Sequence, residues 1–139
     1  MANRIKLGVI GDPIDHSLSP LIHAQFGEAL GLEIDYKAFH VVKKDLDKFI
    51  KSFFADDGYG LNVTLPHKLN CVRSANILSS EVELLGAANT LSKNSNNQII
   101  ASSTDGMGLI RDCSDKNIEI SNKRVLILGA GGASQSIIP

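Results

Sequence analysis

The stretch RIKLGVIGDPIDHSLSP, residues 4–20, contains the features from which we predict the fold. Its apolar run, which ends at Gly11, is typical of a buried β-strand, and the polar residues that follow it indicate a loop. Ser19 and Pro20 then predict the start of a helix, with Ser19 as the N-cap and Pro20 at the first helical position. Gly31 predicts the end of that helix, because glycine is favoured just past a helix C-terminus. A strand, a loop and a helix in this order form the first unit of an α/β fold.

The rest of the chain continues this alternation of strands and helices. Residues 43–54 are expected to form an amphipathic helix, because their apolar side chains recur at helical spacing. Pro66 is expected to open another helix that runs to about Ser74, and the asparagine-rich residues 93–98 indicate a hairpin turn. The further expected elements are strands at residues 34–42, 58–66, 89–93 and 98–102 and helices over residues 80–85 and from about Asp105. We therefore predict an α/β domain with a mostly parallel sheet.

The composition argues against several classes of protein. The chain has 139 residues, 43% hydrophobic and 21% charged, with a formal net charge of -1, so it lacks the excess of Lys and Arg expected of a nucleic-acid-binding protein. No apolar run approaches the roughly 18 residues of a membrane span. Cys71 and Cys113 are isolated, and we expect both to be free, at least partly buried thiols in the reducing cytoplasm. Four dispersed histidines and two lone cysteines offer no metal-ligand spacing.

The stretch RVLILGAGGAS, residues 124–134, predicts a second kind of unit. An apolar strand leads into a glycine-rich turn and a possible helix, which is the context of a dinucleotide-binding loop. There the small residues let the backbone approach a pyrophosphate, and the helix N-terminus attracts its charge. The alternative is a tight turn without a ligand. A complete βαβ unit takes about 30 residues or more, so we expect this chain to be part of a longer protein. We assign residues 1–104 to a substrate-binding and catalytic domain and residues 105–139 to a connecting helix and the start of an incomplete Rossmann domain.

Polar side chains gather at the ends of several predicted strands, where α/β proteins bind ligands. Hydroxyls, amides, one ammonium and one carboxylate together would suit a small polyhydroxylated acid. Each also has a purely structural interpretation: Ser19 and Asp105 as helix N-caps, Thr64 as an ordinary strand residue and Lys68 as a solvated helix residue. The candidates are Ser17, Ser19, Asn62, Thr64, Lys68, Asn89 and Asp105.

The order and spacing of these clusters resemble one family. The stretches GDPIDHSLSPLIH, GLNVTLPHK, GAANT, STDGMG and LILGAGGAS occur in the order and spacing of shikimate dehydrogenases. The resemblance extends from about Lys6 to Ser134. It implies a substrate domain followed by an NADP-binding Rossmann domain, and an enzyme that reduces 3-dehydroshikimate to shikimate in aromatic amino acid biosynthesis. Because members of that family are about twice this length, we expect an N-terminal portion with little or no turnover of its own and a possible homodimer.

The resemblance also implies a role for each candidate residue. Ser17 and Ser19 would bind the substrate carboxylate, whereas Asn62, Thr64 and Asn89 would hold the ring hydroxyls. Lys68 would be the catalytic acid and base, with Asp105 as its partner, and both would lie between substrate and cofactor. A lysine there can protonate the alkoxide that is left when hydride reaches a ketone carbon. The NADP pyrophosphate would lie on Gly129, Ala130, Gly131, Gly132 and Ala133.

The sequence departs from the family pattern in three places. Ala24 stands where Asn is usual, Ser103 replaces the Asn of an NTD motif, and Ser134–Gln135 stand where a small residue and Arg are common. These changes bear on the substrate more than on the fold. We interpret His16 and His67 as local hydrogen-bonding or surface residues.

Other functions remain open at this stage. The same side chains could contact quinate, which has one more hydroxyl. The chain could also be a shikimate-binding module without redox chemistry, or an interaction domain whose exposed strand edge pairs with another chain.

Overall fold

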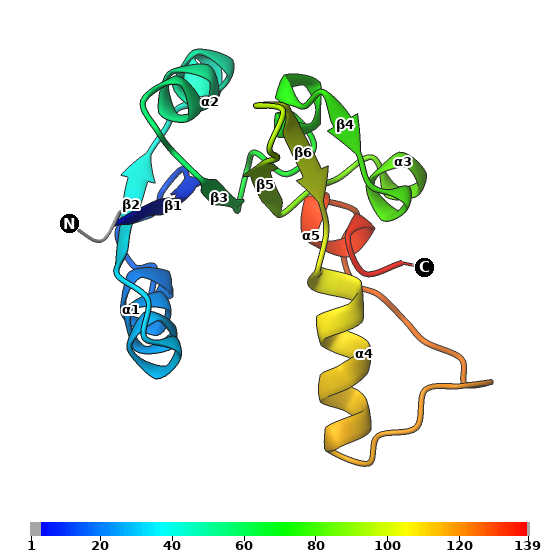
Figure 1. Cartoon of the computed structure of the whole chain (residues 1–139). Helices are drawn as coiled ribbons and strands as arrows, with labels where there is room; N and C mark the ends of the chain where they lie inside the picture. The colour runs from blue at the N-terminus through cyan, green and yellow to red at the C-terminus, as the bar shows by residue number, and fades with distance from the viewer. Residues whose placement is uncertain (1–3, 139) are drawn as a thin grey trace.

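A computed structural model describes residues 4–138, so Met1–Asn3 and Pro139, at the two ends of the predicted domains, lie outside the described residues. The chain forms a six-stranded sheet in the order β2-β1-β3-β5-β6-β4, with helices on both of its faces (Figure 1). The strands are β1 (Ile5–Gly11), β2 (Ile34–His40), β3 (Gly60–Val63), β4 (Ile77–Leu78), β5 (Thr90–Lys93) and β6 (Ile99–Ser102).

One strand runs against the others. β1 pairs in parallel with β2 and β3, and β4 pairs in parallel with β6, whereas β5 is antiparallel to both β3 and β6. The predicted α/β fold with a mostly parallel sheet is therefore confirmed. The predicted hairpin is confirmed as well: β5 and β6 are joined by residues 94–98, and Asn97 adopts a positive φ of 58° in the turn, a conformation that asparagine tolerates.

The helices cover the two faces of the sheet unequally. α2 (Leu46–Ala55) follows a 3₁₀ turn at Lys43–Asp45 and contributes Leu46, Ile50, Phe53 and Phe54 to the core. α1 (Ser19–Leu30) lies on the opposite face and buries only Gly27 (Figure 1). The remaining helices are the 3₁₀ helix η2 (Cys71–Ser74), α3 (Ser80–Leu85), α4 (Asp105–Asp115) and α5 (Gly132–Gln135).

Alternation along β3 separates the core from the candidate site. Leu61 and Val63 are 1% and 2% exposed and belong to the core under α2. Asn62 lies between them in the strand, so its side chain points to the other face. A single short strand therefore contributes both to the core and to the polar cluster described below.

The helix expected from Pro66 to Ser74 is wrong in its first half. The Leu65–Pro66 peptide bond is cis, and residues 65–70 form successive turns instead of α-helix. The amide of His67 donates to the Thr64 carbonyl, and the His67 carbonyl accepts from Asn70 and Cys71. The buried His67 ring, bonded to another segment, holds this turn in place. Lys68 is consequently a turn residue, and helical geometry begins only in η2.

The expected N-cap role of Ser19 is also wrong. The helix already includes Ser19, the cap position belongs to Leu18, and no side chain caps the helix. The Ser19 amide instead donates to the Ser17 hydroxyl at 3.3 Å. Gly31 ends the helix in the left-handed conformation, φ 66°, as predicted. The Ser19 hydroxyl is thus available for another partner.

The apolar run at residues 124–128 is not a strand in this structure. It pairs with no strand among residues 4–138, and Leu126 and Leu128 are 83% and 87% exposed. A strand needs hydrogen-bonding neighbours, and the described residues supply none to this run. The short strand β4 went unpredicted, because two residues are too few to show any periodicity. No helix in the described part of the chain is long and apolar enough to cross a membrane.

Candidate functional site

The predicted site residues come from segments far apart in the chain. Ser17 and Ser19 follow β1, Asn62 and Thr64 lie at the end of β3, and Lys68 is in the turn beyond. Asn89 directly precedes β5, and Asp105 opens α4 after β6. Since β5 runs against its neighbours, its beginning lies at the same sheet end as the C-termini of β1, β3 and β6. The fold therefore collects all seven residues at one end of the sheet.

Lys68 and Asp105 form an ion pair. The Lys68 ammonium donates to Asp105 Oδ2 at 2.6 Å. The two side chains are only 11% and 25% exposed, so Lys68 is not the solvated lysine of the structural interpretation. Asp105 does not cap α4 either, because the cap position is Thr104 and no side-chain cap bond forms. Its carboxylate lies in the first turn of that helix, where a negative charge is favoured by the helix dipole.

Asn89 fixes the second oxygen of Asp105. The Asn89 amide nitrogen donates to Asp105 Oδ1 and to the Thr104 hydroxyl, each at 2.9 Å. Its amide oxygen accepts from the Thr104 backbone nitrogen at 3.1 Å and from the Thr90 hydroxyl at 2.9 Å. One side chain thus holds the start of α4 and one carboxylate oxygen of the ion pair. These contacts leave the Asn89 amide little freedom to turn.

Asn62 is connected to Asn89 through a threonine and is held on its other side by a tyrosine. The Asn62 amide nitrogen donates to the Thr90 hydroxyl at 3.4 Å, and the Tyr36 hydroxyl donates to Asn62 Oδ1 at 2.7 Å. An unbroken hydrogen-bonded network therefore runs from Tyr36 to Lys68, and it contains four of the seven predicted residues.

The three remaining residues line a cavity beside this network. Ser17, Ser19 and Thr64 border a space of about 250 Å³, together with Val9, Pro13, Ile14 and His16. Three hydroxyls converge there above apolar side chains, which is the usual make-up of a small-molecule site. His16, interpreted from the sequence as a surface or hydrogen-bonding residue, is exposed and lies on the rim.

Burial sets the charge state of Tyr36. Loss of solvent raises the pKa of its hydroxyl to about 12, and the neighbouring Ser19 side chain opposes this only in part. Tyr36 is therefore a neutral donor at physiological pH. Its ring stacks on His23 at a centroid distance of 4.2 Å and an interplanar angle of 11°, and burial lowers the pKa of His23. Burial thus favours the uncharged form of both rings.

His67 is part of the interior and not of the surface. It is fully buried, and its Nε2 lies 2.5 Å from the Val41 carbonyl oxygen, so Nε2 must carry the proton. Its Nδ1 has no hydrogen-bond partner within residues 4–138. The ring fastens the turn that carries Lys68 to the segment after β2. Of the two interpretations drawn from the sequence, a hydrogen-bonding residue or a surface residue, the structure supports the first for His67.

The glycine loop combines an exposed part with a buried one. Gly129 adopts φ 121°, a conformation that L side chains rarely adopt, and residues 129–131 are exposed. Gly132 is buried against Lys68, and the exposed Ala133 follows it in α5. An exposed backbone turn of this kind fits a loop that a phosphate group approaches closely.

Two residues of the network went unpredicted from the sequence. Tyr36 and Thr90 occupy strand positions where both residue types are common, so nothing in their spacing marks them. The strand register is the signal that could have identified Tyr36. Tyr36 pairs with Leu7 of β1, and Asn62 pairs with Val9, two residues further along the same strand. Residues separated by two share a face of the sheet, so Tyr36 and Asn62 point the same way.

An α/β domain with polar side chains gathered at its strand ends is typical of proteins that bind small polar molecules. Residues 9–91, more than half of the chain, match the family described as "Shikimate dehydrogenase substrate binding domain". The chain belongs to this family.

Relatives and solved structures agree with this assignment. The chain is 45% identical to "Shikimate dehydrogenase (NADP(+))" of Legionella pneumophila strain Philadelphia 1 over 96% of its own length and 49% of the relative. The Listeria monocytogenes shikimate 5-dehydrogenase crystallised with shikimate and NAD has a TM-score of 0.89 at 36% identity, over 99% of this chain and 47% of the other. The Thermus thermophilus enzyme crystallised with NADP(H) and shikimate has a TM-score of 0.88 at 32% identity, over 96% and 50%. The chain spans about half the length of the curated relatives it matches.

Proposed function

We propose that this chain is the substrate-binding part of an NADP-dependent shikimate dehydrogenase, which reversibly reduces 3-dehydroshikimate to shikimate in aromatic amino acid biosynthesis. The observation that carries the proposal is the shielded Lys68–Asp105 ion pair, 2.6 Å long. It lies at the end of a hydrogen-bonded network that contains Asn62 and Asn89. Shielding an ion pair from water is costly unless further hydrogen bonds satisfy its charges, so such a pair is more often kept where it serves a function. Here Asp105 is satisfied by Asn89, while the remaining ammonium protons of Lys68 can reach a ligand.

The hydroxyl-lined cavity suits the acidic end of the substrate. The hydroxyls of Ser17 and Ser19 would donate to the substrate carboxylate, and Thr64 borders the same space. Asn62 and Asn89 would then face the ring hydroxyls, with Asn89 exchanging one of its four hydrogen bonds for a bond to the ligand. Binding by several fixed hydrogen bonds orients a flat polyol acid against the ion pair.

Lys68 would move the proton. In the reduction, hydride reaches the carbonyl carbon of 3-dehydroshikimate and the carbonyl oxygen becomes an alkoxide. The Lys68 ammonium donates a proton to that oxygen, and Asp105 stabilises the ammonium before the transfer. In the oxidation of shikimate the neutral amine of Lys68 accepts the hydroxyl proton. The nicotinamide cofactor, when bound, supplies or accepts the hydride, and its pyrophosphate would be held by Gly129, Ala130, Gly131, Gly132 and Ala133.

Shikimate binding without turnover is what we expect of the chain by itself. Residues 124–128 have no strand partner within residues 4–138, so no second sheet stands beside the glycine loop in the part of the chain that the structure describes. The substrate residues, by contrast, are held by β1, β3, β5 and α4, all of which are in place. A domain that binds shikimate without redox chemistry is therefore the second candidate function for the chain alone.

Calorimetric titration of shikimate into the chain tests the proposal. We expect saturable binding that is lost in Lys68→Ala and kept in Lys51→Ala, a control lysine that is ion-paired with Asp47 but 67% exposed on α2. Quinate titrated in parallel measures the discrimination between the two acids. Absence of shikimate binding in folded wild-type chain, or equal binding by both lysine variants, would contradict the assigned site.

We also infer a cytoplasmic location and leave a homodimer as a prediction. The location is supported by two free thiols, Cys71, which is buried, and Cys113, which is partly buried. Light scattering coupled to size-exclusion chromatography would measure the mass of the particle in solution, and a monomer at all concentrations would exclude the dimer.

A further inference from the structure

We propose that the short helix α5 positions the Lys68–Asp105 pair, and that Gly106 and Gly132 are the positioning residues through which it does so. The roles given to Lys68 and Asp105 rest on the proposed function, whereas the packing of α5 against them does not. The glycine loop would then have a second task besides binding a cofactor.

One end of α5 rests on Lys68. Gly132, the first residue of the helix, is buried, and a Cβ built on it would lie 3.1 Å from the Lys68 Cβ and 3.8 Å from Leu69 Cγ. The first of these separations is shorter than carbon atoms normally keep. A side chain at this position would therefore require Lys68 or the helix backbone to shift by a few tenths of an ångström.

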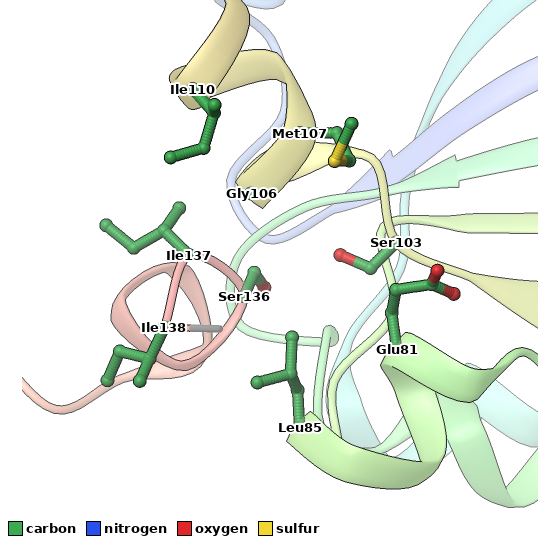
Figure 2. A pocket seen from close by; sticks show the side chains of 9 residues that line it. All are labelled: Glu81, Leu85, Ser103, Gly106, Met107, Ile110, Ser136, Ile137 and Ile138. Carbon is green, nitrogen blue, oxygen red and sulfur yellow. The ribbon is translucent and has the colours of Figure 1, made fainter. Parts of the chain in front are cut away.

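The other end of α5 rests beside Asp105. The residue after Asp105 is Gly106, and a Cβ built on it would lie 3.2 Å from the Ser136 carbonyl oxygen and 3.7 Å from Ile137 Cα. Figure 2 shows this junction: Ser136 and Ile137 face Gly106 of α4, and Ile138 and Leu85 of α3 line the same pocket. The pocket has a volume of about 130 Å³. The first turn of α4, and with it Asp105, is thus packed against the end of α5.

The two contacts are joined by hydrogen bonds inside α5. The Ser136 hydroxyl donates to the Gly132 carbonyl at 2.6 Å, and the side chain of Ser136 is almost completely buried. The Ser136 amide also donates to the Gly132 carbonyl, at 3.0 Å. Because these bonds close a single rigid turn, a movement of one end of α5 moves the other. Lys68 and Asp105 are therefore held against a common support.

This arrangement connects the cofactor loop to the acid–base pair. Gly131 occupies the N-cap position of α5, and the segment assigned to the pyrophosphate, residues 129–133, includes the exposed turn before it and the first two residues of α5. A displacement of that turn is passed to Lys68 through Gly132 and to Asp105 through Ser136 and Gly106. The pair would thus be aligned when the loop is in its bound position.

The test is the acylation of Lys68 by an N-hydroxysuccinimide ester of acetic acid, which needs no ligand and no cofactor. Mass spectrometry gives the ratio of Lys68 modification to that of Lys116, an exposed lysine at the end of α4. Gly132→Ala and Gly106→Ala add one methyl group at each contact. Gly108→Ala is the matched control, because a Cβ at Gly108 meets nothing within 4 Å. Thermal unfolding of each variant reports its overall stability.

We expect the Lys68 to Lys116 ratio to rise by roughly tenfold in Gly132→Ala and Gly106→Ala, the change that corresponds to weakening one charge-assisted hydrogen bond. Gly108→Ala should keep the wild-type ratio. Unchanged ratios in both test variants, or the same rise in the control, would overturn the proposal.

Ser136→Ala covers the case in which an added methyl group prevents folding, because it removes the 2.6 Å bond inside α5 and adds no atom. A raised Lys68 ratio in this variant supports the proposal, and a wild-type ratio refutes it. Shikimate titration of the wild type separates the two inferences. If shikimate does not bind, the proposed function fails, while the acylation ratios still decide the role of α5.

Discussion

Removal of the Tyr36 hydroxyl should weaken substrate binding although Tyr36 is not among the residues expected to touch the substrate. The hydroxyl donates to Asn62 at 2.7 Å. Tyr36→Phe deletes only this oxygen and keeps the ring stacked on His23. Asn62 then loses the bond that holds its amide oxygen, and its amide can turn away from the orientation in which it meets a ligand.

The size of the effect follows from the contacts. A neutral hydrogen bond contributes about 1 kcal/mol net, and a partner left unsatisfied costs about 1–3 kcal/mol when water cannot replace the bond. Asn62 is only partly buried, so water can reach it and the lower value applies. A loss of about 1 kcal/mol corresponds to a dissociation constant for shikimate that is about fivefold larger.

Calorimetry of shikimate with four variants tests this reasoning. Tyr59→Phe is the matched control, since Tyr59, the second tyrosine of the chain, is 60% exposed. If Tyr36 acts through Asn62, Tyr36→Phe has no further effect in the Asn62→Ala background. An unchanged affinity for shikimate in Tyr36→Phe would refute the argument. It would also be refuted if the losses of binding free energy in the two single variants added up in the double variant.

Three further predictions concern stability and reactivity. Iodoacetamide should modify Cys113 and spare Cys71 in the native chain, because burial raises the pKa of the Cys71 thiol to about 12. Peptide mass spectrometry measures the labelling, and equal labelling of the two cysteines would contradict the packing of the turn at residues 67–71. The free energy of unfolding should fall between about pH 9 and pH 12. The pKa values of Cys71 and Tyr36 are ordinarily 9.0 and 10.0, and both are raised to about 12 in the folded state. The folded state therefore keeps protons that the unfolded state has already lost, and this difference destabilises the folded state as the pH rises. Urea titrations across this range check it, and Tyr36→Phe should flatten the upper part of the slope. Ile50→Ala should cost about 2–4 kcal/mol of unfolding free energy, because the side chain of Ile50 in α2 is completely buried in the core, whereas Lys51→Ala in the same helix should change it little.

Local sequence signals predicted most elements of the fold. The strand at Ile5–Gly11, the helix ending at Gly31, the amphipathic α2 and the asparagine-rich hairpin all formed where the pattern placed them. Two errors share a cause, since both involve contacts that no local signal contains. Residues 65–70 form turns around the buried His67 ring, which is bonded to the Val41 carbonyl. Residues 124–128 have strand character, but no neighbouring strand pairs with them within residues 4–138.

The candidate site was predictable in its residues but not in its connections. The polar types at strand ends identified Lys68, Asp105 and Asn89, and the structure brings these three within hydrogen-bonding distance. The separation of these three residues along the chain gave no information on which of them form hydrogen bonds, because those contacts depend on the reversed direction of β5. Tyr36 and Thr90 escaped detection for a related reason. Their function is to hold other side chains, and only the three-dimensional register reveals it.

The β5–β6 hairpin offers a place at which the chain can be modified without touching the site. Thr90 pairs with Ser102 at the end beside Asn89 and Asp105, whereas Lys93 pairs with Ile99 at the opposite end of the sheet. The loop beyond, at residues 95–97, is exposed, and its backbone is held by Asn94. Exposed loop tips of this kind tolerate insertions well. A fluorophore, an affinity tag or a surface tether placed between Ser95 and Asn96 would therefore report on the domain from the end of the sheet that is farthest from its chemistry.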